Sequence, residues 1–189
     1  MKIGIDLDDT LSYTLQNMIE FHNKNYGTNF KFEDYTKYEQ WYIWSENLEE
    51  ALKRLYEFHV SSYGENIEPI LYAKDIHEKV KNNNQIFVIT ARSKNIEKET
   101  KEWLEKYYPN IFSKIYFADN YSQEDKKITK KGICDELGID ILIEDNLQYA
   151  LECVSPNRKV YLIDYPWNQS DALPPNVERV NSWKEIGIN

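Results

Sequence analysis

The chain has little cysteine, no long apolar segment and no excess of positive charge. Its two cysteines, Cys134 and Cys153, are too few for a disulfide framework or for a zinc cluster, which takes about four ligands. No apolar run approaches the roughly 20 residues that cross a bilayer, and the amino terminus lacks the apolar core of a signal peptide. The net charge of -9 argues against a broad binding surface for a nucleic-acid backbone. We therefore expect a cytoplasmic protein without a membrane or nucleic-acid polymer as partner.

The chain is long enough to bury a sizeable core. Its 189 residues, of which 41% are hydrophobic, fit one domain or one domain with an inserted subdomain. The sequence contains no internal repeat, and no Gly/Ser or Pro linker is long enough to separate two domains. Composition leaves the oligomeric state open, a homodimer included.

Apolar runs typical of buried strands recur along the chain, with helical patterns between the later ones. The runs are residues 3–7, 86–89, 115–117, 141–143 and 160–163. Near-continuous apolar strands that alternate with helices predict an α/β fold, with a parallel sheet covered on both faces. Residues 173–176 are typical of an irregular turn, which we expect before a short last helix.

The stretch from about residue 11 to residue 71 departs from this alternation. Two sets of apolar residues at helical spacing flank an aromatic segment without strand periodicity. We expect a helical hairpin that is inserted after the first strand and lies over the strand ends as a small cap, or lid. The expected boundaries are 13–71 for this cap, and 1–12 together with 72–189 for the catalytic core.

Acidic and hydroxyl side chains follow the ends of the predicted strands. Asp6 and Asp8 come after the first strand and are spaced i, i+2, which presents both to the same side. Such close like charges repel unless a cation or a shared proton compensates, and a hard divalent metal is the natural compensator here. Thr90 ends the second strand, and Glu144 and Asp145 end the fourth. Because the carboxyl ends of parallel strands share one edge, we expect a metal-dependent active site there.

Four segments in order resemble the motifs of the haloacid dehalogenase-like (HAD) hydrolase superfamily, whose members are mostly aspartate-nucleophile phosphatases. Residues 6–10, Asp-Leu-Asp-Asp-Thr, match the first motif, Asp-x-Asp-x-Thr, and Thr90 matches the Ser or Thr of the second. Residues 130–146 carry a lysine near a helix start and then an acidic pair, as motifs three and four do. The resemblance covers the whole chain. It implies a Rossmann-like three-layer core with a helical cap.

The resemblance also implies a reaction through an aspartyl-phosphate. Asp6 would attack phosphorus, and Asp8 would protonate the leaving oxygen and then deprotonate the attacking water. Mg²⁺ would be held by Asp6, the backbone carbonyl of Asp8 and Asp145. Thr90 would bind phosphate oxygens, and Lys130 would offset the accumulated negative charge. Further implied contacts to the substrate are those of Thr10, Ala91 and Arg92.

Several assignments stay open at this point. Lys131 is the alternative to Lys130 as the motif-three lysine. Glu144 replaces the commoner Asp, and its longer side chain could contact the metal through water or act as a base. Arg92 could clamp the substrate phosphate or form a surface ion pair. The two aspartates and the threonine could also cap helices. Three histidines lie in helical patterns, which favours packing or surface roles: His22, His59 and His77.

Within the superfamily, the chain resembles the 5'(3')-deoxyribonucleotidase-type branch and small bacterial nucleotidases. Thr-Ala-Arg at 90–92, Glu-Asp-Asn at 144–146 and Tyr-Pro-Trp-Asn at 165–168 carry this resemblance. It implies a small phosphomonoester substrate, namely a ribo- or deoxyribonucleoside monophosphate. Cap aromatics would stack on its base, and the candidates are Trp41, Trp44 and Tyr42.

Other interpretations remain beside this one. Trp41 and Trp44 are spaced i, i+3 and share a helical face, which could face either the base or the core of the cap. A phosphatase for another small metabolite, such as a sugar phosphate, would use the same catalytic core under a different cap. A non-catalytic phosphate- or metal-binding module is the alternative of a different class. The presence of Asp8 weighs against it, because binding alone needs no acid.

Overall fold

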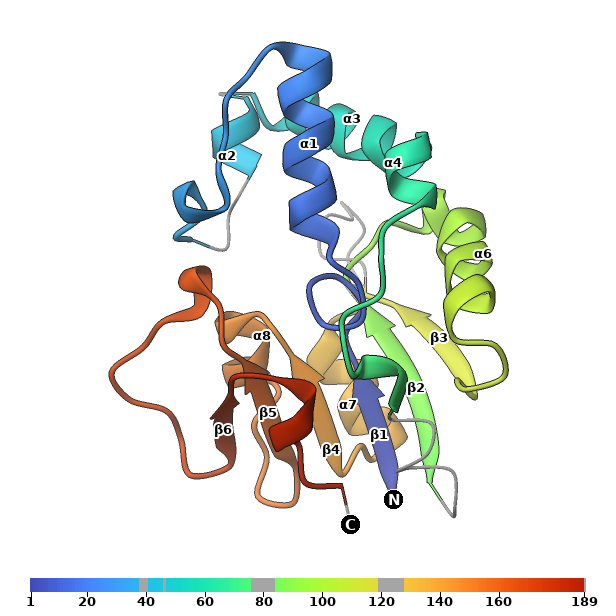
Figure 1. Cartoon of the computed structure of the whole chain (residues 1–189). Helices are drawn as coiled ribbons and strands as arrows, with labels where there is room; N and C mark the ends of the chain where they lie inside the picture. Colours follow the sequence, from blue (N-terminus) through green and yellow to red (C-terminus); the bar gives the residue numbers. More distant parts are fainter. Residues whose placement is uncertain (38–40, 46, 76–83, 119–127, 189) are drawn as a thin grey trace.

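A sheet of parallel strands forms the centre of the molecule, as Figure 1 shows for the computed structural model. The structure describes residues 1–37, 41–45, 47–75, 84–118 and 128–188. Over these residues the sheet has six strands in the order β3-β2-β1-β4-β5-β6. The strands are β1 (Lys2–Ile5), β2 (Gln85–Thr90), β3 (Lys114–Phe117), β4 (Ile141–Glu144), β5 (Lys159–Ile163) and β6 (Val177–Val180).

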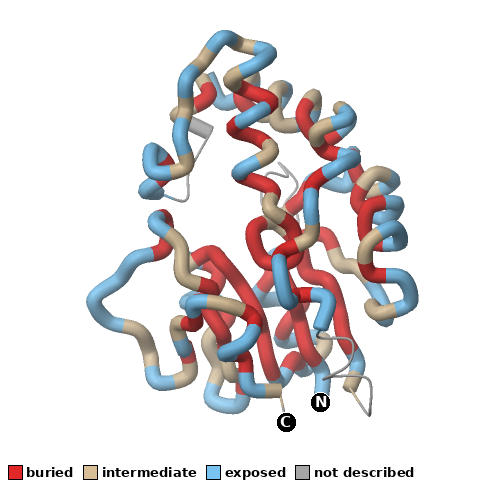
Figure 2. Tube along the Cα trace, viewed as in Figure 1, coloured by how far each residue is buried: buried red, intermediate tan, exposed pale blue. Residues whose placement is uncertain are grey.

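Both faces of the sheet are covered, and successive residues of a strand point into different cores. Ile86 and Val88 of β2 belong to the apolar core that includes side chains of α6 and η5, whereas Phe87 and Ile89 belong to the core under α7 and α8. The covering elements are α6 (Glu97–Tyr107), α7 (Lys130–Leu137), α8 (Leu147–Glu152) and η5 (Trp183–Glu185). Figure 2 shows that the central strands are buried along most of their length. The predicted α/β fold with a parallel sheet is confirmed.

The sequence does not predict the sixth strand. β6 has four residues, and only its two terminal valines, Val177 and Val180, are buried, so the apolar pattern is too short to stand out. It pairs with β5 in parallel, with Val160 opposite Val177. The predicted turn at 173–176 therefore leads into a strand, and the expected last helix is the single turn η5.

Helices stand above the carboxyl ends of the strands, where the sequence predicts a helical hairpin (Figure 1). These helices, called the cap below, are α1 (Thr14–Tyr26), α2 (Trp41–Trp44), α3 (Leu48–His59) and α4 (Ser62–Glu65). α1 ends at Gly27, whose φ of 65° suits glycine. α3 begins after Asn47, whose side chain accepts the amide of Glu49 at 2.8 Å. The insertion is therefore more than a hairpin, because the short α2 and α4 flank α3.

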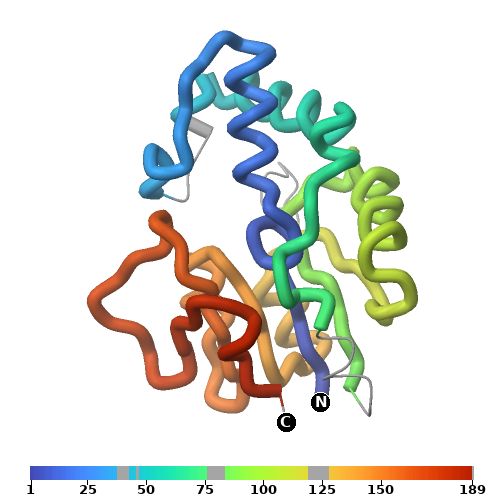
Figure 3. Tube along the Cα trace, in the orientation of Figure 1, coloured from blue at the N-terminus to red at the C-terminus, as the bar shows by residue number. Residues whose placement is uncertain are grey.

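The chain enters and leaves the cap side by side. Figure 3 shows the descending segment after α4 beside the loop that precedes α1, and a β-bridge joins Ser12 to Pro69 there. Both chain termini lie at the opposite end of the sheet. None of the described helices combines the length and the hydrophobicity that a membrane span requires.

An aromatic cluster packs inside the cap around His22 of α1. The imidazole stacks on Trp44 with ring centres 5.4 Å apart, and it lies 4.9 Å from the ring of Tyr26. Neither ring nitrogen of His22 has a hydrogen-bond partner among the described residues. Burial, aided by the charge of Arg54, lowers the pKa of His22 to about 4. The imidazole is therefore neutral at pH values where an exposed one would take up a proton.

Replacing His22 with Phe should reduce the pH dependence of stability. The native pKa is about 4 and the unfolded one about 6.5, so between these values the unfolded chain binds the extra proton. The native state then loses stability as the pH falls. Between about pH 7 and about pH 5, His22 should account for a loss of about 2 kcal/mol in the free energy of unfolding. Urea denaturation at both pH values measures this loss, and an equal loss in His22→Phe would contradict the neutral imidazole.

Candidate active site

Lys130 joins two carboxylates that come from different strands at the carboxyl edge of the sheet. Its Nζ lies 2.5 Å from Oδ1 of Asp6 and 2.8 Å from Oε2 of Glu144, and only 2% of the residue is exposed. The start of α7 places it there, because the Thr129 hydroxyl caps this helix by accepting the Gly132 amide at 3.0 Å. Lys130 is thus the first helical residue and contacts the sheet.

The neighbouring lysine has a different environment. Lys131 is exposed on α7 and forms an ion pair with Asp135, four residues along the same helix. Of the two lysines that the sequence leaves open, the structure therefore brings Lys130 to the carboxylates. A helix turns by about 100° per residue, so the side chains of two adjacent residues point to different surroundings.

Asp145 joins Asp6 and Glu144 in a buried acidic cluster. One carboxylate oxygen from each of the three lies within 4.8 Å of the others. Carboxylate oxygens are the donors that hard divalent cations prefer. Among the described residues, Lys130 is the one lysine that contacts this group of three carboxylates, so the cluster retains an excess of negative charge. The donor set therefore fits a divalent cation such as Mg²⁺.

The protonation of this cluster reflects the same excess of negative charge. Burial, together with the neighbouring Glu144 and Asp8 carboxylates, raises the pKa of Asp6 to about 7, although Lys130 acts in the opposite direction. Burial and then the charges of Glu144 and Asp6 raise the pKa of Asp145 well above its ordinary value. A cation bound at these oxygens would lower both pKa values and keep the carboxylates ionised.

Asp8 has its own partner just beyond the end of the neighbouring strand β2. Arg92 donates to it through Nη2 at 2.6 Å and through Nε at 3.0 and 3.1 Å, and Thr14 donates at 2.7 Å. Burial alone would raise the pKa of Asp8, but the guanidinium outweighs it and lowers the pKa to about 2. Arg92 is itself buried and follows β2, where its amide donates to the Thr90 hydroxyl at 3.1 Å. The open question about Arg92 is thus partly answered: its pair is internal and not on the surface.

A tight turn follows these aspartates. Asp9 has a φ of 53°, in the left-handed region, and its side chain accepts the Leu15 amide in the first turn of α1 at 3.0 Å. The helix-capping role that the sequence leaves open therefore belongs to Asp9, while Asp6 and Asp8 face other partners. The buried hydroxyl of Thr10 has no hydrogen-bond partner among the described residues. It is available to a ligand or to water.

Asp145 accepts hydrogen bonds from two residues for which the sequence predicts no role. The indole of Trp167 donates to its Oδ2 at 2.9 Å, and the Asn168 amide donates to its backbone oxygen at 2.5 Å. Both belong to the single turn η4 (Pro166–Asn168) after β5. The sequence signal was the Tyr-Pro-Trp-Asn segment at 165–168, which carried a family resemblance but no assigned role.

The cap contributes a residue to the surroundings of Asp8. His59 ends α3 and is buried. Burial, and then the charge of Arg92, lower the pKa of His59 to about 3, against the attraction of Asp8. A neutral imidazole from the cap therefore lies within the electrostatic reach of the Asp8–Arg92 pair. The helical pattern around His59 in the sequence indicated a packing or surface role.

The predicted base-stacking residues are only partly described. Trp44 is buried in the cap, where its indole donates to the Tyr35 hydroxyl at 3.0 Å and its ring stacks on His22. Of the two orientations that the sequence leaves open, Trp44 has the one that faces the cap core. The side chains of Trp41 and Tyr42 lie outside the described part of the structure, as does His77.

Comparisons with known proteins show what the whole chain is similar to. A family model described as "5' nucleotidase, deoxy (Pyrimidine), cytosolic type C protein" matches residues 1–188. A protein of Bacillus cereus named "Putative nucleotidase" is 25% identical over 99% of this chain and 96% of its own length. A nucleotidase of Clostridium acetobutylicum is 30% identical over 60% of this chain and 54% of its own. The fold matches a haloacid dehalogenase-like family hydrolase of Streptococcus pneumoniae with a TM-score of 0.64 at 13% identity, covering 89% of this chain and 86% of that one.

The two lysines offer a matched test of the buried cluster. Lys130→Met should lower the free energy of unfolding by about 3–5 kcal/mol near neutral pH, because it leaves two buried carboxylates without their cation. Lys131→Met should change it by no more than about 1 kcal/mol, because its ion pair is exposed. Chemical denaturation in the presence of EDTA measures both values. Equal effects of the two substitutions would show that Lys130 does not compensate the negative charge of the cluster.

Proposed function

The chain belongs to the 5' nucleotidase, deoxy (pyrimidine), cytosolic type C family, and from this premise we propose that it hydrolyses nucleoside monophosphates with Mg²⁺. Its membership makes it a HAD-like phosphatase of the nucleotidase type. Beyond this membership, we propose a bound Mg²⁺, an aspartyl-phosphate intermediate and a (deoxy)ribonucleotide substrate. The observation that carries it is the meeting of Asp6, Lys130 and Asp145 at one edge of the sheet.

In the proposed reaction Asp6 is the nucleophile. One of its carboxylate oxygens attacks phosphorus, and the bond from phosphorus to the nucleoside oxygen breaks. Lys130 contacts Asp6 at 2.5 Å and would hold it in place while negative charge accumulates. Asp6, Asp145 and the carbonyl oxygen of Asp8 would hold Mg²⁺, which when bound supplies positive charge to the nucleophile and the phosphoryl group.

Asp8 is the proposed acid and base. It would give a proton to the departing nucleoside oxygen, then take one from the water that hydrolyses the aspartyl-phosphate and regenerates Asp6. In the structure Arg92 keeps the pKa of Asp8 at about 2, so the carboxylate is ionised and has no proton to donate. A substrate phosphate that draws the guanidinium onto its own oxygens would raise that pKa. The proposed contact of Arg92 with the substrate therefore prepares Asp8 for its first step.

The remaining parts of the site would position the substrate. Thr90 at the end of β2 and the amides of Ala91 and Arg92 after it would bind phosphate oxygens, and the Thr10 hydroxyl, which has no partner among the described residues, is a further candidate. We propose that residues 13–71 form the lid and that 1–12 and 72–189 form the catalytic core. Because Trp44 faces the interior of the cap, we assign it to the support of the lid.

A substrate panel with the Asp6→Asn variant tests the proposal. Phosphate release should be fastest with nucleoside monophosphates, should require Mg²⁺ and should stop with EDTA. Asp6→Asn should lower turnover by more than about a thousandfold, because an amide cannot act as the nucleophile. The isosteric side chain should leave the thermal midpoint nearly unchanged, and Asp171→Asn, at an exposed position, serves as the matched control.

The outcomes separate the alternatives. Activity spread over sugar phosphates would keep the mechanism and remove the nucleoside specificity. Wild-type turnover by Asp6→Asn would contradict the mechanism itself. Phosphate or metal binding without turnover of any substrate would favour a non-catalytic module.

A further inference from the structure

We propose that Trp167 is a positioning residue that orients the carboxylate of Asp145 for metal binding. This inference rests on the proposed metal site and adds a residue to it. The indole Nε1 donates to Oδ2 of Asp145 at 2.9 Å, and both residues are buried. No described residue donates to the other oxygen, Oδ1. The hydrogen bond thus occupies one carboxylate oxygen and leaves the second for a cation.

The turn that carries Trp167 is firmly attached to the end of the sheet. The Asn168 side chain donates to the backbone oxygens of Asp145 at 2.5 Å and of Ile163 at 2.7 Å, so it ties η4 to both β4 and β5. Arg179 of β6 donates to the backbone oxygen of Asn168 at 2.7 Å. These bonds hold the indole and the backbone of Asp145 in one frame, so the carboxylate has little freedom to change its direction.

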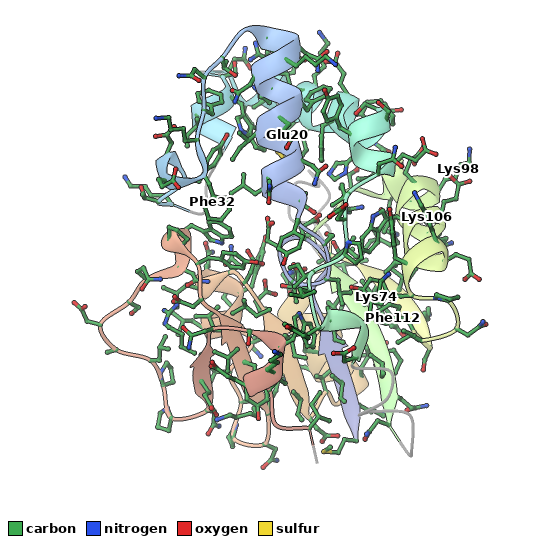
Figure 4. All side chains as sticks on the ribbon, viewed as in Figure 1. Glu20, Phe32, Lys74, Lys98, Lys106 and Phe112 are labelled. Atoms are coloured by element: carbon green, nitrogen blue, oxygen red, sulfur yellow. The ribbon has the colours of Figure 1, made fainter. Side chains whose placement is uncertain are left out.

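Aromatic rings shield this hydrogen bond from water. Tyr165 stacks on Trp167 with ring centres 4.3 Å apart and planes 8° from parallel, and Phe32 meets the indole edge-on at 5.5 Å. Phe32 belongs to the turn η1 (Phe32–Asp34) that follows α1, and Figure 4 shows it where the cap meets the core. A hydrogen bond to a carboxylate is stronger where water is excluded.

The chemistry of the indole suits this role. An indole N–H is only a donor, so Asp145 must accept, and the direction of the bond is unambiguous. Without that donor, repulsion from Glu144 and Asp6 would favour rotation of the carboxylate away from the cluster. Hydrogen-bond partners of this kind typically change metal affinity by about 10- to 100-fold.

Trp167→Phe tests the inference because phenylalanine retains a ring against Tyr165 and Phe32 and lacks the donor. The dissociation constant for Mg²⁺, measured by isothermal titration calorimetry, should rise by about tenfold or more. Trp103→Phe is the matched control, because it removes a comparable indole hydrogen bond away from the cluster. Trp103 lies buried in α6, and its indole N–H donates to the backbone oxygen of Ile67 at 2.8 Å. The Mg²⁺ affinity of Trp103→Phe should stay within about twofold of wild type, with a similar fall in thermal midpoint.

The outcomes distinguish this inference from the metal site on which it rests. Asp145→Asn should abolish the calorimetric Mg²⁺ signal, and a wild-type protein that binds no Mg²⁺ would overturn the metal site and this inference together. If the wild type binds Mg²⁺ and Trp167→Phe binds it equally well, only the positioning role is overturned. An equal loss of affinity in Trp103→Phe would also overturn it, because that loss would follow from lowered stability.

Discussion

The buried contact of Lys130 with Asp6 and Glu144 is the interaction on which the site depends. Parallel pairing sets Ile5 of β1 opposite Ile143 of β4, so the residues that follow, two carboxylates, must lie side by side. Uncompensated charges in such a place would strongly destabilise the fold. One ammonium, delivered by the capped start of α7, makes the arrangement stable. A single ammonium does not neutralise all three carboxylates of the cluster, so enough negative charge remains to attract a metal ion.

Two aspartates separated by one residue have opposite electrostatic environments. Burial and neighbouring carboxylates raise the pKa of Asp6 to about 7, while the guanidinium of Arg92 overcomes burial and lowers the pKa of Asp8 to about 2. Each environment comes from a different element: the acidic end of β4 for Asp6, and Arg92, two residues after β2, for Asp8. The order of the strands is therefore what gives the proposed nucleophile, Asp6, and the proposed acid and base, Asp8, their different environments.

Much of this arrangement could be predicted from local pattern, and the failures have identifiable causes. The acidic pair after β1 and the threonine at the end of β2 were visible because strand ends in a parallel sheet share an edge. The strand β6 was not predicted, because its four residues, of which two are buried valines, show little periodicity. The orientation of Trp44 could not be derived, because its spacing fits either face of a helix and its partners, Tyr35 and His22, lie outside its own helix.

The fold class and the chemical types at the strand ends can be read from the sequence alone, because both follow from period-two and helical patterns within short windows. Tertiary structure decided which groups meet. It selected Lys130 over Lys131, paired Arg92 with Asp8, and placed the indole of Trp167 on Asp145. These contacts join residues that lie between 22 and 124 positions apart along the chain. Such distances close only when strands and helices pack, and no local pattern encodes them.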